Sequence, residues 1–205
     1  MYLDGLCFIT DRNICGLTSG EMSSLVLRAG IKWIQYREKN KPRRDIYNEA
    51  ALLRKLTAEF KASFIVNDHA DIALAVNADG VHLGQEDLPL KEARKILGKT
   101  KIIGISTHSI EQAIEAEAGG ADYVGFGPVF HTMTKDAGKP KGIQMLKEVK
   151  RHVNIPVIAI GGITSENLQS VLDSGADAVA VASAILRGNI SDNISGFLKI
   201  LYRKQ

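Results

Sequence analysis

Cysteine is scarce in this sequence, which contains only Cys7 and Cys15. Two cysteines are too few to build a disulfide framework. Cys7 lies in an apolar run and is typical of a small buried hydrophobic residue. Neither cysteine lies in the pattern expected of a metal ligand or a nucleophile. We therefore expect a chain that folds without disulfide bonds in a reducing cytoplasm.

Long apolar runs and blocks of like charge are also missing. No stretch approaches the ~18 uninterrupted apolar residues of a membrane span. The segment 1–10 contains Asp4 and lacks a basic start and a long apolar core, so we expect no signal peptide. The net charge is only +3, and basic residues neither cluster nor alternate with aromatic ones. We expect neither a nucleic acid nor a membrane as partner.

What the sequence does contain is a series of short, β-branched, nearly continuous apolar runs. Such runs are typical of parallel strands, which are covered on both faces. The predicted strands are Gly5–Thr10, Trp33–Arg37, Ser63–Val66, Gly80–Leu83, Lys101–Ile105, Asp122–Gly125, Pro156–Ile160 and Ala178–Val181.

Amphipathic stretches separate these runs. Ile46, Leu53, Leu56 and Phe60 recur at helical spacing, for example, although the stretch after the third strand, 71–76, is short. Eight strand–helix alternations without a composition break or a linker predict an α/β fold, a single (β/α)8 TIM barrel over residues 1–205.

Three of the predicted strands open on the same short pattern, a small residue followed by Asp. The three acids are Asp79, Asp122 and Asp177, and they precede the fourth, sixth and eighth strands. Shared turn chemistry, with Asp bonding local backbone, is the explanation we prefer. Strand starts form the stability face of a barrel rather than its catalytic face.

Charged residues gather at the opposite, C-terminal ends of the strands. Alternation along the second strand places Gln35, Arg37 and Lys39 on one face. Two cations without paired acids would suit a polyanion such as pyrophosphate. The alternative is a solvated strand end with Glu38 as the partner, and the residues alone do not separate the two hypotheses.

Acids follow the next two strands. Asn67 and Asp68 come directly after the third strand, and Asp87 comes just past the fourth. The alternatives are a helix N-cap for Asp68 and a turn or helix start for Asp87. Together, however, the two carboxylates belong to adjacent strand ends of a closed barrel and can approach one ion. Two carboxylates, substrate phosphate oxygens and water are the usual ligands of Mg²⁺.

The later strand ends carry hydroxyl, imidazole and ammonium groups. Ser106 can donate to a phosphate oxygen, and His108 is either an acid–base group or a residue that only bonds locally at a helix start. Thr132, Thr134 and Lys135 open a long polar segment, which is either a lid over phosphates or an exposed loop.

The last two strand ends predict a phosphomonoester site. Gly162 follows the seventh strand and would allow a phosphate to approach the backbone, while Ser183 begins the helix after the eighth strand. Barrels often bind phosphate at these two loops through backbone amides.

These motifs, in this order, resemble the thiamine-phosphate synthase family from Ile9-Thr10-Asp11 to Ser183-Ala184-Ile185. The signatures that carry the resemblance are Gln-Tyr-Arg-Glu-Lys at 35, Asn-Asp at 67, Gly-Val-His-Leu-Gly-Gln-Glu-Asp to 87, Gly-Pro-Val-Phe-His-Thr-Met-Thr-Lys to 135, Gly-Gly-Ile at 161 and Val-Ala-Val-Ala-Ser-Ala-Ile to 185.

The resemblance implies a transferase of thiamine biosynthesis that joins a hydroxymethylpyrimidine diphosphate to a thiazole phosphate and releases pyrophosphate, with Mg²⁺. It implies that the pyrimidine diphosphate is bound by Gln35, Arg37, Lys39, Asn67, Ser106 and Lys135, of which Arg37, Lys39, Ser106 and Lys135 are catalytic. It implies Asp68 and Asp87 as Mg²⁺ ligands, and it assigns the thiazole phosphate to Thr132, Thr134, Gly162, Ala182 and Ser183. The implied partners are small phosphorylated molecules, with a homo-oligomer left open.

The implied mechanism is dissociative, and the residues agree with it. No side chain has the pattern of a nucleophile or a base-activated hydroxyl, and the cations surround the predicted leaving group. One alternative is a thiazole tautomerase on the same barrel, which resembles this family and uses a histidine where His108 stands. That branch typically lacks the metal carboxylates and the Thr-x-Thr-Lys loop. A sensor that binds a phosphorylated ligand without catalysis is the second alternative.

Overall fold

A computed structural model describes residues 5–132 and 138–202. Eight parallel strands form a closed barrel in chain order, and β8 pairs with β1 to close it. The strands are β1 (Gly5–Ile9), β2 (Trp33–Tyr36), β3 (Ser63–Asn67), β4 (Gly80–Leu83), β5 (Ile102–Thr107), β6 (Tyr123–Phe126), β7 (Val157–Ile160) and β8 (Ala178–Val181). The predicted TIM barrel is confirmed, and each predicted strand agrees with the observed one to within two residues at either end.

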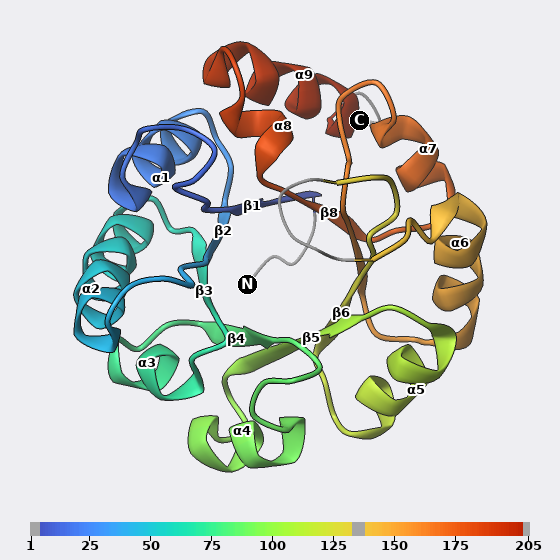
Figure 1. Cartoon of the computed structure of the whole chain (residues 1–205), viewed down its shortest axis with the longest axis horizontal. Helices are drawn as coiled ribbons and strands as arrows, with labels where there is room; N and C mark the ends of the chain where they lie inside the picture. Colours follow the sequence, from blue (N-terminus) through green and yellow to red (C-terminus); the bar gives the residue numbers. More distant parts are fainter. Residues whose placement is uncertain (1–4, 133–137, 203–205) are drawn as a thin grey trace.

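Helices form a ring around the strands (Figure 1). They are α1 (Ser19–Arg28), α2 (Arg43–Glu59), α3 (Ala70–Ala75), α4 (Leu90–Leu97), α5 (Ile110–Ala118), α6 (Gly142–His152), α7 (Leu168–Asp173), α8 (Ser183–Leu186) and α9 (Ile190–Leu201). Side-chain caps fix several of their starts. Thr18 and Glu21 form a capping box at α1, and Ser109 caps α5. Among the described helices, none is both long and apolar enough to cross a membrane.

Alternation along each strand divides the core into two layers. Leu6 and Phe8 of β1 pack outward against the helices, whereas Cys7 and Ile9 pack inside the barrel. Trp33 and Tyr123 meet edge to face within the inner layer, with ring centroids 5.6 Å apart. The interior is therefore filled by side chains, which leaves the C-terminal ends of the strands as the place where a ligand can enter.

The repeated acids at the strand starts are structural, as predicted, but their partners are not local. Asp122 accepts a hydrogen bond from the Ile103 amide of the preceding strand at 2.7 Å and pairs with Arg94 of α4. Asp79 and Asp177 repeat the same arrangement with their own preceding strands and helices. Each acid thus ties one βα unit to the next at the end of the barrel opposite the charged cluster.

Candidate active site

An open cavity lies among the C-terminal ends of β1, β2 and β5 to β8. It brings together six of the predicted site residues: Arg37, Ser106, Thr132, Gly162, Ala182 and Ser183. Much of the remaining wall is aliphatic and includes Ile9, Ile160 and Ala180. The combination of an apolar wall with a few polar groups is typical of a pocket for a small ring-containing ligand.

Arg37 is held in place by the neighbouring strand. Its guanidinium lies 3.5 Å from the buried carboxylate of Asp11, and its backbone amide donates to the Thr10 hydroxyl at 2.9 Å. Arg37 and Asp11 line the main cavity and also a second, more polar cavity, which contains Lys39. The prediction that Arg37 and Lys39 stand without paired acids is therefore wrong: Asp11 pairs with one and Asp68 with the other.

Asp68 has an unusual backbone conformation. Its φ is +66°, a left-handed region that Asp adopts more readily than most residues but still at some cost in strain. Two hydrogen bonds fix the conformation. The backbone amide of Asp68 donates to the His82 carbonyl at 2.8 Å, and the side-chain amide of Asn67 donates to the Asp68 carboxylate. The helix-cap alternative for Asp68 is wrong, because α3 begins after His69 and has no side-chain cap.

Asp68 and Asp87 face one another across the ends of β3 and β4. Burial, followed by the hydrogen bond and charge of Asp87, raises the pKa of Asp68, while Lys39 opposes that rise. Asp87 also accepts a hydrogen bond from the Gly84 amide at 2.6 Å, so the turn predicted for it is present. The carboxylates are thus held close together at an energetic cost that a cation would relieve.

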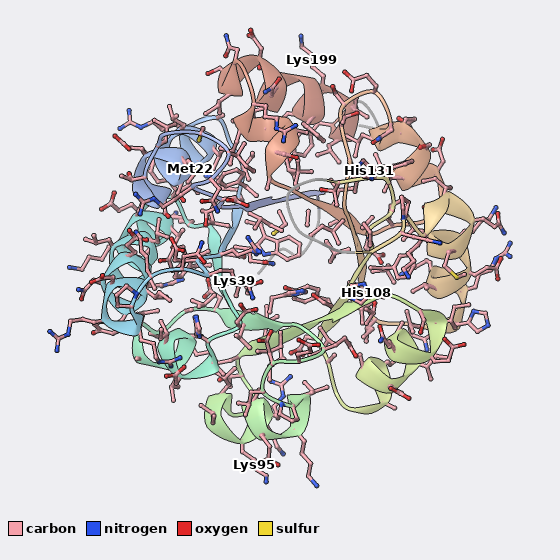
Figure 2. The ribbon with its side chains drawn as sticks, in the orientation of Figure 1. Met22, Lys39, Lys95, His108, His131 and Lys199 are labelled. Atoms are coloured by element: carbon pink, nitrogen blue, oxygen red, sulfur yellow. The ribbon has the colours of Figure 1, made fainter. Side chains whose placement is uncertain are left out.

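Two further predicted site residues lie on β2 and β3. Gln35 is buried on the same inward strand face as Trp33. Asn67 is half-buried, and its amide is engaged with Asp68. Figure 2 shows Lys39 and His108 toward the middle of the barrel view, whereas Lys95 and Lys199 lie on its outer rim.

The His108 side chain forms a hydrogen bond outside its own loop and helix. Its backbone amide donates locally to Gln112, but its Nδ1 lies 2.6 Å from the Gly127 carbonyl beyond β6. The ring lines the main cavity near Ser106. The alternative in which His108 only bonds locally is therefore wrong, and its imidazole is part of the cavity wall.

The ends of β7 and β8 form the remaining wall. Gly162 has a φ of +65°, and a Cβ atom there would lie 2.4 Å from the His131 carbonyl oxygen. Only glycine allows the chain after β6 to pack this closely, and that chain carries Thr132 into the cavity. Thr134 and Lys135 lie outside the described residues.

Three residues at or behind the cavity were not singled out from the sequence patterns: Asp11, His82 and Tyr123. Asp11 follows β1 directly. The rule that polar residues just after a strand belong to the site, called here the strand-end rule, singled out Asp68 and would also have found Asp11. His82 and Tyr123 stand within strands, where a polar side chain at an inward position is the available signal. His82 Nε2 lies 2.8 Å from the Ser106 hydroxyl, which places it directly behind a cavity residue.

Comparisons with known proteins point in one direction. The family model described as thiamine monophosphate synthase matches residues 6–185. The thiamine-phosphate synthase of Clostridium novyi is 48% identical over 198 residues, which cover 96% of either chain. That of Lawsonia intracellularis is 51% identical over 167 residues, 81% of this chain and 77% of the relative. A solved thiamine phosphate pyrophosphorylase from Pyrococcus furiosus superposes with a TM-score of 0.89 at 41% identity, covering 96% of this chain and 95% of that one.

Proposed function

The chain belongs to the thiamine monophosphate synthase family, and we propose that it joins 4-amino-2-methyl-5-hydroxymethylpyrimidine diphosphate to 4-methyl-5-(2-phosphoethyl)thiazole, giving thiamine phosphate and pyrophosphate. It is accordingly a transferase of thiamine biosynthesis. The observation that carries the proposal is the meeting of Asp68, Asp87, Lys39 and Arg37 beside a largely apolar cavity. We further propose a cytoplasmic location, which the unbonded Cys7 and Cys15 support.

The diphosphate belongs on the cationic side of the site. Arg37 and Lys39 line one polar cavity, and Lys135 joins them in the proposal from the sequence. Their charges suit a diphosphate, which an arginine contacts through two parallel hydrogen bonds. Ser106, Asn67 and Gln35 would then orient the pyrimidine, since all three lie at the ends or inner faces of β2, β3 and β5.

The thiazole phosphate belongs on the other side of the cavity. Gly162, Ala182 and Ser183 offer backbone amides and a hydroxyl at the loops where barrels commonly bind phosphate, and Thr132 adjoins them, with Thr134 proposed from the sequence. The aliphatic side chains of Ile9, Ile160 and Ala180 would contact the azole ring. This arrangement would place the azole ring in the same cavity as Arg37 and Ser106.

The carboxylates of Asp68 and Asp87 fit a hard divalent cation. In the described part of the chain no group of three or more His, Cys, Asp or Glu side chains could hold a metal. Mg²⁺ needs fewer protein ligands, because water and phosphate oxygens complete its octahedron. When bound, the ion would neutralise charge on the diphosphate oxygens.

The proposed reaction has two steps, departure of pyrophosphate and attack by the thiazole nitrogen. The bond between the methylene carbon and the diphosphate oxygen breaks first, and its electron pair leaves with pyrophosphate. The thiazole nitrogen then donates its lone pair to the pyrimidinylmethyl cation and forms the new C–N bond. Arg37 and Lys39 favour the first step, because their hydrogen bonds strengthen as negative charge grows on the departing oxygen. The cavity walls favour the second by holding the two rings together.

An assay that measures both products tests this function. Purified protein, both substrates and Mg²⁺ should yield thiamine phosphate and pyrophosphate in equal amounts, and a chelator should stop both. A tautomerase acting through His108 would release no pyrophosphate from this mixture. A sensor would bind the ligands in a calorimeter without turnover. Either of the last two results would overturn the proposal.

Lys39 gives a prediction for the metal itself. Its ammonium is bonded to the Asp68 carboxylate, so it competes with a divalent cation for the same oxygen. Lys39 is about 43% exposed, and an ion pair of that kind contributes roughly 0.2–1 kcal/mol. Lys39→Met should therefore bind Mn²⁺, used as a probe without substrate, roughly 1.4- to fivefold more tightly, although its turnover falls.

The matched control for this prediction is Lys41→Met. Lys41 lines the same polar cavity, but its ammonium pairs with Glu49 instead of Asp68. Its Mn²⁺ affinity, measured by calorimetry or by the electron paramagnetic resonance of free Mn²⁺, should stay near that of the wild type. Equal or weaker Mn²⁺ binding by Lys39→Met would show that Lys39 does not compete at the metal site.

A further inference from the structure

A buried hydrogen-bonded chain lies behind the main cavity. The Tyr123 hydroxyl of β6 lies 3.0 Å from Nδ1 of His82 on β4, and Nε2 of the same imidazole lies 2.8 Å from the Ser106 hydroxyl on β5. Tyr123 and His82 are 1% and 7% exposed, and neither lines the cavity. Ser106 does line it. The chain therefore runs from the barrel interior to one polar group of the site.

Two glycines make room for this chain. Tyr123 stacks on the His82 ring with centroids 5.4 Å apart, and a Cβ atom at Gly104 would lie 2.0 Å from the Tyr123 ring. A Cβ atom at Gly125 would lie 3.0 Å from the His82 ring. Strand pairing sets His82 opposite Gly104 and Gly104 opposite Tyr123. The backbone thus specifies where both rings lie.

The protons of this chain can be assigned from its chemistry. Burial raises the pKa of Tyr123 well above its usual range, so its hydroxyl keeps its proton. A buried hydroxyl proton needs an acceptor, and Nδ1 of His82 is the acceptor beside it. With Nδ1 accepting, the neutral imidazole carries its proton on Nε2 and donates it to the Ser106 oxygen. The hydroxyl hydrogen of Ser106 is then directed away from His82.

We propose that Tyr123 and His82 are positioning residues that keep the Ser106 hydroxyl a hydrogen-bond donor toward the pyrimidine diphosphate. The opposite tautomer of His82 would accept from Ser106 and take that donor away from the ligand. Tyr123 selects between the two tautomers without touching the ligand. This inference rests on the proposed function for its ligand, but the state of the imidazole does not depend on any activity.

The tautomer is measured first, in the ligand-free protein. Two-dimensional ¹H–¹⁵N spectra that correlate the protons on the ring carbons with the ring nitrogens distinguish the tautomers, and the spectrum of His82→Gln identifies which of the five histidines is His82. We expect a single tautomer with the proton on Nε2 in the wild type. We expect a measurable Nδ1-protonated population in Tyr123→Phe. A wild-type proton on Nδ1 would overturn the proposal whether or not the protein is an enzyme.

A double-mutant cycle then tests the consequence for catalysis. Tyr123→Phe should lower kcat roughly three- to tenfold, the effect of one lost hydrogen bond, with thiamine phosphate as the readout. In the Ser106→Ala background the same substitution should have almost no further effect, because the hydroxyl that it positions is gone. Equal fold-losses in both backgrounds would mean that Tyr123 acts only through the fold, which contradicts the proposal.

Three variants keep this cycle decisive. Tyr36→Phe is the matched control, because Tyr36 is also buried and its hydroxyl donates to Glu49, but on the helix side of the barrel. Its effect on kcat should be the same with Ser106 and with Ala at 106. If Tyr123→Phe does not fold, His82→Gln, which keeps a donor near Ser106, should retain more turnover than His82→Leu. Wild-type protein that makes no thiamine phosphate would refute the proposed function, and the spectra would still decide the tautomer.

Discussion

Asp68→Asn should lower turnover about 100- to 1,000-fold and leave the barrel at least as stable as the wild type, because the two effects have separate causes. The loss of activity follows from the loss of one of two proposed metal ligands. The expected stability follows from the neighbours of Asp68, which include a second carboxylate, Asp87, within interaction range. Removing the repulsion between like charges at an active site is a recognised way to gain stability at the expense of function.

The replacement amide fits the existing contacts. Its oxygen can accept from the Asn67 amide, as the carboxylate does, and its nitrogen can donate to Asp87. The left-handed backbone at 68 is also compatible with Asn. Lys39 loses its partner but is about 43% exposed and can be solvated, so this loss is small.

The stability difference should depend on pH in a defined direction. Since burial and Asp87 raise the pKa of Asp68 in the folded state, ionisation at this site disfavours folding. The stabilising contribution of protonated Asp68 is fully present below the unfolded-state pKa and is lost as pH rises through the raised folded-state pKa. The unfolding free energy of Asp68→Asn relative to the wild type should therefore be smallest near about pH 4 and grow toward about pH 8.

Denaturant unfolding without divalent ions measures this difference, and Asp177→Asn serves as the control. Asp177 lies at the opposite end of the barrel, where it accepts from the Val157 amide at 2.7 Å and pairs with Lys150. Asp177→Asn should lose stability and keep the kcat of its folded fraction. A strongly destabilised Asp68→Asn, or one with wild-type turnover, would contradict the assignment of Asp68 as a charged ligand held against repulsion.

Asp68 and Asp177 are chemically identical, but their positions along the strands predict different roles for them. The same reasoning shows how much of the molecule could be predicted from the sequence. Apolar runs and amphipathic stretches specify the strands and helices locally, so the barrel and its strand limits follow from patterns within about ten residues. The strand-end rule then places Arg37, Asp68, Ser106 and Ser183 at one end of the barrel and Asp177 at the other.

What the sequence did not predict is how side chains from different strands pair. Arg37 lies 26 residues from Asp11, and Lys39 lies 29 residues from Asp68, so no local pattern identifies either partner. The chain from Tyr123 through His82 to Ser106 likewise depends on strand pairing and on the space left by Gly104 and Gly125. Such contacts require the register of the sheet, which the apolar pattern alone does not fix.

Gly162→Ala should combine a large loss of stability with weakened binding of the thiazole phosphate. A side chain at a φ of +65° disfavours the folded backbone by about 1–2 kcal/mol. The new Cβ atom would also lie 2.4 Å from the His131 carbonyl oxygen and 2.8 Å from the Phe130 Cβ atom. Crowding of this kind typically adds about 1–3 kcal/mol. The expected loss in unfolding free energy is therefore roughly 2–5 kcal/mol.

Hydrogen bonds hold the segment around Phe130 against residue 162, so the clash can be relieved only if this segment moves. The Val129 and Phe130 amides donate to the carbonyls of Ile160 and Gly161 at 2.8 and 2.9 Å. Moving the segment away from residue 162 would break these bonds and shift Thr132, which lines the cavity. KM for the thiazole phosphate should therefore rise more than KM for the pyrimidine diphosphate.

Gly188→Ala separates the two contributions to the loss. Gly188 has a similar φ of +75°, but a Cβ atom there would meet no other atom within 4 Å. Its loss in unfolding free energy should stay near the conformational contribution of about 1–2 kcal/mol, and its KM values should match those of the wild type. If the two variants lose equal stability and bind the thiazole phosphate equally well, the close approach of the β6 and β7 ends does not shape the site. A larger loss confined to Gly162→Ala would mean that one backbone position, through the segment packed on it, sets the thiazole side of the cavity.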